Sequence, residues 1–250
     1  MPLIKFKKAI FYYCHIPKCA GTSVEDFLMQ SECEVAFLDR KYLASKAALR
    51  KWCHTSPQHI NGEFVDLLFP KSFFDGVFAV IRDPVERFKS AFEYARSNSP
   101  YPPTQNIDKF AANTLTKNFT KIGWYDNHFL PQQAFIPPRR DCQLFSLSSK
   151  GIASLKKYIE AEIVQSPLEK KFPLKNESIR KPQEISQKTV EIIRNIYSYD
   201  YELHNASLRG DVVNIDHTIE TKEIAFSGKI PYLARRLLKF VELRLNPSRL

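Results

Sequence analysis

The sequence predicts an α/β fold in which a P-loop-like central parallel sheet is flanked by helices. Two strand–turn–helix units and a later alternation of strand and helix patterns support this prediction. The first unit begins with the apolar and aromatic run FYYCHI (11–16), typical of a buried strand, and continues through a turn into the periodic stretch VEDFLM (24–29). This order places backbone N–H groups and a helix N-terminus in front of an anion.

The second unit follows the same order. GVFAVI (76–81) is almost continuously apolar, as in a strand that is covered on both faces. Arg82 comes next, then Asp83 as the expected N-cap and Pro84 at the first helical position. VERFKSAFEYA (85–95) repeats apolar residues at helical spacing. Parallel sheets bind ligands outside the carboxyl ends of their strands, where both turns lie.

The rest of the chain continues the alternation. A further strand is expected at CQLFSL (142–147), helices at 151–163 and 186–204, and a Pro-rich loop at 97–106. We expect a single domain over residues 1–250, with its core at about 10–205 and a basic amphipathic tail at about 218–250.

The composition is that of a globular protein. Hydrophobic residues make up 44% and aromatic residues 13% of the 250 residues, enough for a large core. No run approaches the ~18 apolar residues of a membrane span, and the N-terminus lacks the pattern of a signal peptide. Five cysteines without a CxxC pair predict free, buried thiols, no disulfide framework and no zinc site. We therefore expect a reducing, cytoplasmic environment, with the Golgi lumen as the alternative.

The positive charge is concentrated at the two ends of the chain. The formal net charge is +10, yet residues 9–228 contribute only +2 of it. A nucleic-acid-binding protein would show a basic face through the fold, so we expect no nucleic-acid partner. The apolar stripe of the tail favours either packing against the protein's own core or a partner subunit, or peripheral contact with an anionic membrane.

The turn of the first unit, HIPKCAGTS (15–23), combines features that suit a phosphate-like anion. Pro17 stiffens the exit from the strand, Gly21 allows close backbone approach, and Lys18 supplies a mobile cation. Thr22 and Ser23 offer hydroxyls and amides at the helix start. Nucleoside triphosphatases instead use GxxxxGK[ST], in which the lysine follows the second glycine. Here Lys18 precedes the only glycine of the loop, which argues against that class.

The turn of the second unit carries a second pair of candidates. Arg82 emerges at a strand end, where a guanidinium can bind a phosphate with two N–H groups. Ser90 follows two helical turns later and could reach the same group. Arg87 lies between them, and its residue type fits a structural role as well as a ligand contact.

Both motifs resemble those of the sulfotransferases that use 3′-phosphoadenosine 5′-phosphosulfate (PAPS), most closely the carbohydrate group known as sulfotransferase family 2, which is similar to heparan sulfate 2-O-sulfotransferase. The resemblance implies that the first loop binds the 5′-phosphosulfate and that Arg82 and Ser90 bind the 3′-phosphate. The implied loop residues are Pro17, Lys18, Cys19, Ala20, Gly21, Thr22 and Ser23. It further implies sulfuryl transfer to a hydroxyl, expected on a carbohydrate or glycoconjugate, without a metal.

The resemblance also implies a catalytic base and further contacts. Members of the family place a His or Glu some 30–40 residues after the loop lysine, and His54 and His59 follow Lys18 by 36 and 41 residues. His54 matches this spacing better, with His59 as the alternative. FPLKNESIRKP (172–182) resembles a loop that closes over the nucleotide, with Lys175 and Arg180 as candidate contacts.

A further segment resembles the family's acceptor cleft. It is DNHFLPQQAFI (126–136), in which His128, Gln132 and Gln133 either contact substrate or pack in the core. Two other functions stay open: a P-loop kinase or NTPase, and a non-catalytic nucleotide- or polyanion-binding protein on the same fold.

Overall fold

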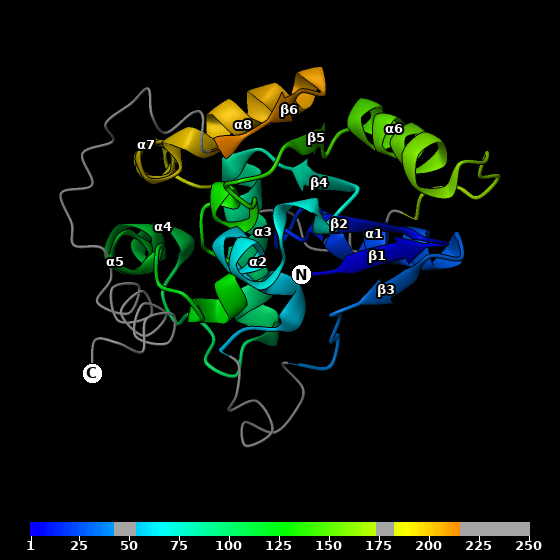
Figure 1. Ribbon diagram of the computed structural model, residues 1–250. Helices are drawn as coiled ribbons and strands as arrows, with labels where there is room; N and C mark the ends of the chain where they lie inside the picture. Colours follow the sequence, from blue (N-terminus) through cyan, green and yellow to red (C-terminus); the bar gives the residue numbers. More distant parts are fainter. Residues whose placement is uncertain (43–53, 174–182, 216–250) are drawn as a thin grey trace, which may run out of the picture. The chain divides into compact units, whose positions relative to one another are not determined.

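The computed structural model describes residues 1–42, 54–173 and 183–215, which belong to one compact unit that ends at Ile215 (Figure 1). Its centre is a six-stranded sheet in the order β3-β1-β2-β4-β5-β6. The strands are β1 (Leu3–Phe6), β2 (Ala9–Cys14), β3 (Glu34–Ala36), β4 (Gly76–Ile81), β5 (Cys142–Ser146) and β6 (Val212–Val213).

The three central strands, β2, β4 and β5, are parallel. All three are rich in apolar residues and largely buried, as expected for strands that are covered on both faces. The edge strands β3 and β6 are short, and they and β1, which lies between β3 and β2, are antiparallel to their neighbours. The predicted α/β class with a parallel centre is confirmed.

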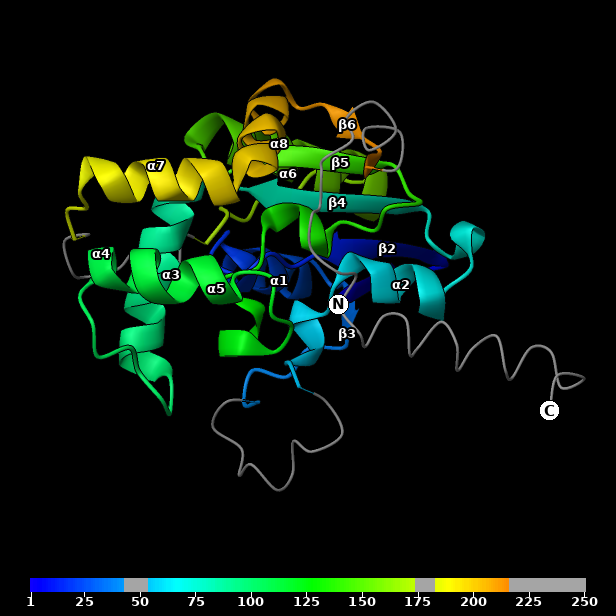
Figure 2. The same cartoon turned by 90° about the vertical axis from the view of Figure 1, so that its left-hand side faces the viewer.

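Helices cover both faces of this sheet. They are α1 (Gly21–Gln30), α2 (Gly62–Leu68), α3 (Pro84–Asn98), α4 (Ile107–Phe110), α5 (Thr116–Asn118), α6 (Ser149–Tyr158), α7 (Gln187–Ile196) and α8 (Ser198–Arg209). Two π-helical segments, Ala111–Leu115 and Ile159–Val164, follow α4 and α6. Figures 1 and 2 show α6 and α8 on opposite sides of β5.

Two apolar cores stabilise the arrangement. The larger core surrounds the sheet and includes Tyr13, Phe27 and Phe78. The second joins α3, the segment from α4 to α5, and α7 through aromatic side chains such as Phe88 and Phe110. The N-terminus of α3 follows the sequence prediction, because the side chain of Asp83 accepts a hydrogen bond from the Glu86 amide and Pro84 is the first helical residue.

The prediction of one helix over 186–204 is wrong. The chain breaks at Tyr197 (φ −114°, ψ 31°), which separates α7 from α8. Two side chains next to the break are fixed to the segment near residue 130. The Tyr197 hydroxyl donates to the carbonyl of Phe129 (2.6 Å), and Asp200 accepts from the amides of Gln132 and Gln133. These buried contacts override a helical pattern that is continuous in the sequence.

The four cysteines of the described segments, Cys14, Cys19, Cys33 and Cys142, are free and buried, as predicted.

Among the helices of the described segments, none combines the length and the apolar character that crossing a membrane requires. The basic tail, expected at about 218–250, lies outside the described residues.

Candidate active site

The candidate site lies at the carboxyl ends of two neighbouring parallel strands. Cys14, the last residue of β2, is paired with Ala79 of β4. The loop that follows β2 and Arg82, which follows β4, therefore meet at the same edge of the sheet. The sequence predicted this juxtaposition.

The loop between β2 and α1 is shaped to receive an anion. Lys18 (φ 69°) and Ala20 (φ 60°) both adopt the left-handed conformation, which is uncommon for residues other than glycine. Among the described residues, the amides of Ala20, Gly21 and Thr22 have no hydrogen-bond partner. These amides lie at the positive end of the α1 dipole. Successive N–H groups in such a turn form an anion-binding concavity.

Gly21 accommodates a buried histidine next to this loop. A Cβ atom at position 21 would lie 2.1 Å from Nε2 of His15, far inside contact distance. The His15 Nδ1 atom lies 2.5 Å from a carboxylate oxygen of the buried Glu25, whose other oxygen faces Arg40 at 3.4 Å. Burial lowers the pKa of His15, which favours a neutral ring that donates from Nδ1 to Glu25. The glycine is therefore required by packing as well as by backbone approach.

Lys18 is a cation without a carboxylate partner in the part of the chain that the structure describes. Its ammonium lies over the ring of Tyr94, with Nζ 4.3 Å from the ring centroid. Burial, together with the positive charge of Arg82, lowers the pKa of Lys18 to about 8. A buried cation held close to another cation is stabilised by an anionic ligand.

Arg82 lies next to this cation, Ser90 lies on the helix that carries Tyr94, and Arg87 contacts the framework of the site. The Arg82 guanidinium donates to the carbonyl of Lys18 (3.3 Å). Ser90 is partly buried on α3 and precedes Tyr94 by four residues, so both lie on one face of the helix. Arg87 is buried and donates to the carbonyls of Pro17 (3.2 Å) and His128 (3.1 Å). Arg87 thus joins the segment around residue 128 to the loop at residues 15–23, which we call the donor loop after the role that the family resemblance implies.

Gln132 also connects elements of the framework. Its side-chain oxygen accepts from the Arg82 amide (3.1 Å) and the Cys19 thiol (3.4 Å), and its amide nitrogen donates to the Arg82 carbonyl (2.9 Å). It is fully buried, and its backbone amide donates to Asp200. Burial raises the pKa of Asp200 to about 6, although the nearby positive charge of Arg87 opposes this. Gln133 is partly buried and donates its backbone amide to Asp200.

The two candidate bases occupy different environments. His54 is exposed and its backbone packs against Gly123. His59 is buried, and its Nδ1 atom lies 2.7 Å from Oδ2 of Asp126 and 3.0 Å from the Ser56 hydroxyl. The Asp126 carboxylate fixes the proton of His59 on Nδ1, which leaves Nε2 as the atom that can accept a proton. The ring of His59 contacts that of His15 (centroids 4.8 Å apart), so it lies next to the donor loop.

Asp126 belongs to an unusual turn that the sequence did not reveal. Tyr125, Asp126 and Asn127 all have positive φ, between 47° and 64°. Such residues cost of order 1–3 kcal/mol each and cluster at functional sites. Asn127 holds the turn, because its side chain donates to the His59 carbonyl and accepts from the Gly123 amide. The tolerance of Asp and Asn for this conformation was the only signal in the sequence.

Asp126 is kept ionised in this turn. Burial alone would raise the pKa of its carboxyl, but the electrostatic interaction and hydrogen bond with His59, together with the hydrogen bond from the Ser56 amide, lower it to about 2. His59, Asp126 and His128 each place a ligand atom within 4.8 Å of the others and could in principle hold a metal ion. The hydrogen bonds of the three side chains already account for their positions. His128 uses Nδ1 toward the Tyr125 carbonyl (2.7 Å).

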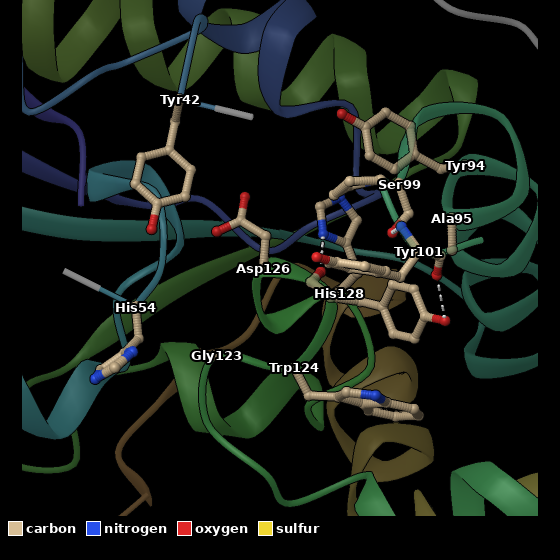
Figure 3. Close-up of a pocket in the computed structure, with 12 residues that line it drawn as sticks. Tyr42, His54, Tyr94, Ala95, Ser99, Tyr101, Gly123, Trp124, Asp126 and His128 are labelled. Carbon is tan, nitrogen blue, oxygen red and sulfur yellow. Dashed lines mark hydrogen bonds between the residues drawn. The ribbon is translucent and has the colours of Figure 1, made fainter. Parts of the chain in front are cut away.

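A cavity of about 290 Å³ adjoins these residues (Figure 3). Its lining consists of Tyr42, His54, Tyr94, Ala95, Ser99, Pro100, Tyr101, Gly123, Trp124, Tyr125, Asp126 and His128. Tyr94 connects the cavity with the donor loop. Its ring contacts the ammonium of Lys18 in the loop and stacks on the ring of His128 in the cavity lining (centroids 4.7 Å apart, planes at 8°). Burial, the neighbouring His59 and the positive charge of Lys18 lower the pKa of His128 to about 3, so this ring is neutral.

The comparisons with known proteins agree with the motifs. Residues 3–205 match the sulfotransferase family. The chain belongs to this family. No curated protein and no solved structure gave a match. The match spans strands β1 to β5, the donor loop and the cavity of this sulfotransferase, and it supports sulfuryl transfer as the general activity. The candidate nucleotide contacts Lys175 and Arg180 lie outside the described residues.

Proposed function

We propose that this sulfotransferase moves the sulfuryl group of PAPS to a hydroxyl of a carbohydrate or glycoconjugate. One observation carries the proposal. The loop amides without a hydrogen-bond partner lie next to two cations, Lys18 and Arg82. Neither cation has a close carboxylate partner among the described residues. Within the described segments, Glu86 is the one carboxylate that approaches Arg82, at 4.0 Å. The site thus matches a donor that carries several anionic groups.

The donor loop and Arg82 divide the nucleotide between them. The amides at the start of α1 and the ammonium of Lys18 bind the 5′-phosphosulfate. Arg82 and Ser90 bind the 3′-phosphate, as the family resemblance implies. When the sulfur–oxygen bond to the leaving phosphate breaks, Lys18 stabilises the negative charge that develops on the bridging oxygen. Such a fixed cation acts more strongly in a site from which water is excluded.

His59 is the base that the geometry favours, in place of His54. It is buried between the donor loop and two residues of the cavity lining, Asp126 and His128. His59 Nε2 accepts the proton of the acceptor hydroxyl as the oxygen attacks sulfur in line with the leaving group, and adenosine 3′,5′-bisphosphate (PAP) departs. Asp126 stabilises the imidazolium that results. His54 is exposed and turned away from Asp126 at the edge of the cavity, and no carboxylate of the described residues pairs with it (Figure 3).

Nucleotide specificity tests this assignment. We expect PAP to raise the thermal unfolding midpoint in the presence of a metal chelator, because a ligand of the folded state stabilises it. ATP, which lacks the 3′-phosphate, should raise the midpoint much less. Arg82→Ala should remove most of the difference between the two nucleotides. Equal stabilisation by both, or an absolute need for magnesium, would contradict the assignment of Arg82 and Ser90 and favour a kinase or NTPase.

The packing around Gly21 leads to a second expectation. In Gly21→Ala the new methyl group meets the His15 ring, so the ring or the donor loop must shift. We expect a loss of about 1–3 kcal/mol in unfolding free energy and a marked loss of PAP affinity by calorimetry. Ala153→Ser, an equally small change at an exposed position of α6, is the control. Unchanged PAP affinity in Gly21→Ala would mean that the loop does not bind the nucleotide.

A further inference from the structure

The cavity beside the donor loop has a chemical character that the family assignment does not define. Five of its lining side chains are aromatic: Tyr42, Tyr94, Tyr101, Trp124 and Tyr125. No lysine or arginine belongs to the lining as far as the chain is described, and its only carboxylate, Asp126, is paired with His59. The walls are therefore aromatic and close to neutral.

The size of the cavity limits the acceptor. Ligand pockets commonly measure ~300–1,000 Å³, and this cavity, at about 290 Å³, is at the lower end. One sugar ring fits such a volume, whereas several consecutive rings do not. The remainder of a longer glycan or an aglycone would extend past the exposed rim.

The rim carries an aromatic platform. Tyr101 is 83% exposed, although it belongs to the cavity lining. Its backbone is fixed, because its carbonyl accepts a hydrogen bond from the Tyr125 hydroxyl (3.0 Å). An exposed aromatic ring on an anchored backbone offers the electron-rich face on which the C–H groups of a pyranose stack. The nearby Ser99 and the tyrosine hydroxyls can serve the remaining sugar hydroxyls.

The charges around the cavity favour neutral acceptors over acidic ones. In the ternary complex Lys18 and Arg82 are engaged by the nucleotide, which brings further negative charge to the site. An acidic sugar would lie near this negative charge and near Asp126, and the described lining has no cation to pair with it. Repulsion between the like charges would weaken its binding. A phenol would use the aromatic walls but leave the polar groups of the rim without partners.

We propose that the acceptor is a single uncharged sugar ring, at the end of a glycan or glycoside, that stacks on the aromatic lining and presents one hydroxyl to His59. This inference rests on the proposed sulfotransferase function and specifies its substrate class. It excludes uronic-acid polysaccharides as the preferred acceptors.

The experiment compares acceptors at the same PAPS concentration. The full chain is assayed for radiolabelled sulfate transfer to neutral hexosides, to unsulfated uronic-acid oligosaccharides and to simple phenols. We expect kcat/KM for the best neutral hexoside to exceed that of the other two classes by at least about tenfold. Calorimetric titration of the PAP-loaded protein with the same compounds gives a second readout that does not depend on turnover.

Substitutions at the rim test whether the preference for neutral sugars depends on this cavity. Tyr101→Ala should raise KM for the neutral hexoside about tenfold, with little change in PAP affinity, and Tyr101→Phe should recover most of the loss. Leu67→Ala, at a residue 68% exposed on α2 and outside the cavity, is the matched control.

The outcomes distinguish this inference from the function on which it rests. Preferred transfer to the acidic oligosaccharide or to a phenol would overturn the neutral-sugar assignment and leave the sulfotransferase intact. The neutral-sugar assignment is also overturned if PAP binds but no neutral sugar binds to the PAP-loaded protein or accepts sulfate. Absence of PAP binding would contradict the proposed function itself.

Discussion

Replacing His59 with alanine should lower kcat by about two to four orders of magnitude, the usual contribution of a positioned general base. The reason is the position of its ring between the donor loop and the cavity, with Nδ1 held by Asp126. PAP affinity should change little, because the role that we propose for the imidazole is toward the acceptor and not the nucleotide. The measurement pairs single-turnover rates with calorimetric PAP affinity, and the latter also shows that the variant is folded.

Two further variants sharpen this test. Asp126→Asn should lower kcat by a smaller factor and leave PAP affinity unchanged, because it disturbs the proton on His59 Nδ1 without removing Nε2. His54→Ala should affect KM for the acceptor more than kcat, since His54 belongs to the cavity lining and is exposed. A near-normal rate in His59→Ala combined with a large loss in His54→Ala would return the role of base to His54.

Replacing Lys18 with methionine should weaken PAPS binding and turnover together, because in the proposed mechanism the ammonium meets the phosphosulfate in both the ground state and the transition state. The predicted loss in kcat/KM is about a thousandfold or more, comparable with the removal of one essential electrostatic contact. Lys157→Met, at an exposed lysine of α6, is the control for the loss of one positive charge.

The lowered pKa of Lys18, about 8, gives this prediction a pH dependence. The free protein loses the positive charge of Lys18 as the pH rises through this value, and the anionic nucleotide binds the charged form. PAP affinity should therefore vary little between about pH 6, where the phosphates of PAP begin to take up protons, and about pH 7, and should fall about tenfold per pH unit above the pKa of Lys18. Binding should take up a proton in the same range. Lys18→Met should lack both effects, and a pH-independent affinity in the unchanged protein would argue against Lys18 as a contact.

The donor side of the site could be predicted from sequence because its determinants are local. The loop at 15–23 follows one buried strand and starts one helix, and Arg82, Asp83 and Pro84 follow the next strand. Each unit carries its own pattern of apolar residues, turn residues and caps. The rule that ligands bind at the carboxyl ends of parallel strands then brings the two together.

The acceptor side depends on contacts between distant segments, which no local pattern encodes. Spacing from Lys18 favoured His54, whereas burial and the Asp126 hydrogen bond, which joins residues 67 positions apart, favour His59. Gln132 and Arg87, polar residues near the motifs, turned out to be buried framework residues. The break at Tyr197 has the same origin, because it depends on the Phe129 carbonyl.

The measurement that tests the central claim most directly is the conversion of PAPS to PAP with simultaneous transfer of labelled sulfate, followed in the presence of a metal chelator. The account predicts that label moves to a hydroxyl acceptor, that one PAP forms for each sulfate transferred, and that Lys18→Met abolishes both. If the unchanged protein binds PAP tightly but transfers no sulfate to any hydroxyl acceptor, the account is contradicted, and the chain is a nucleotide-binding protein without catalysis on a sulfotransferase fold.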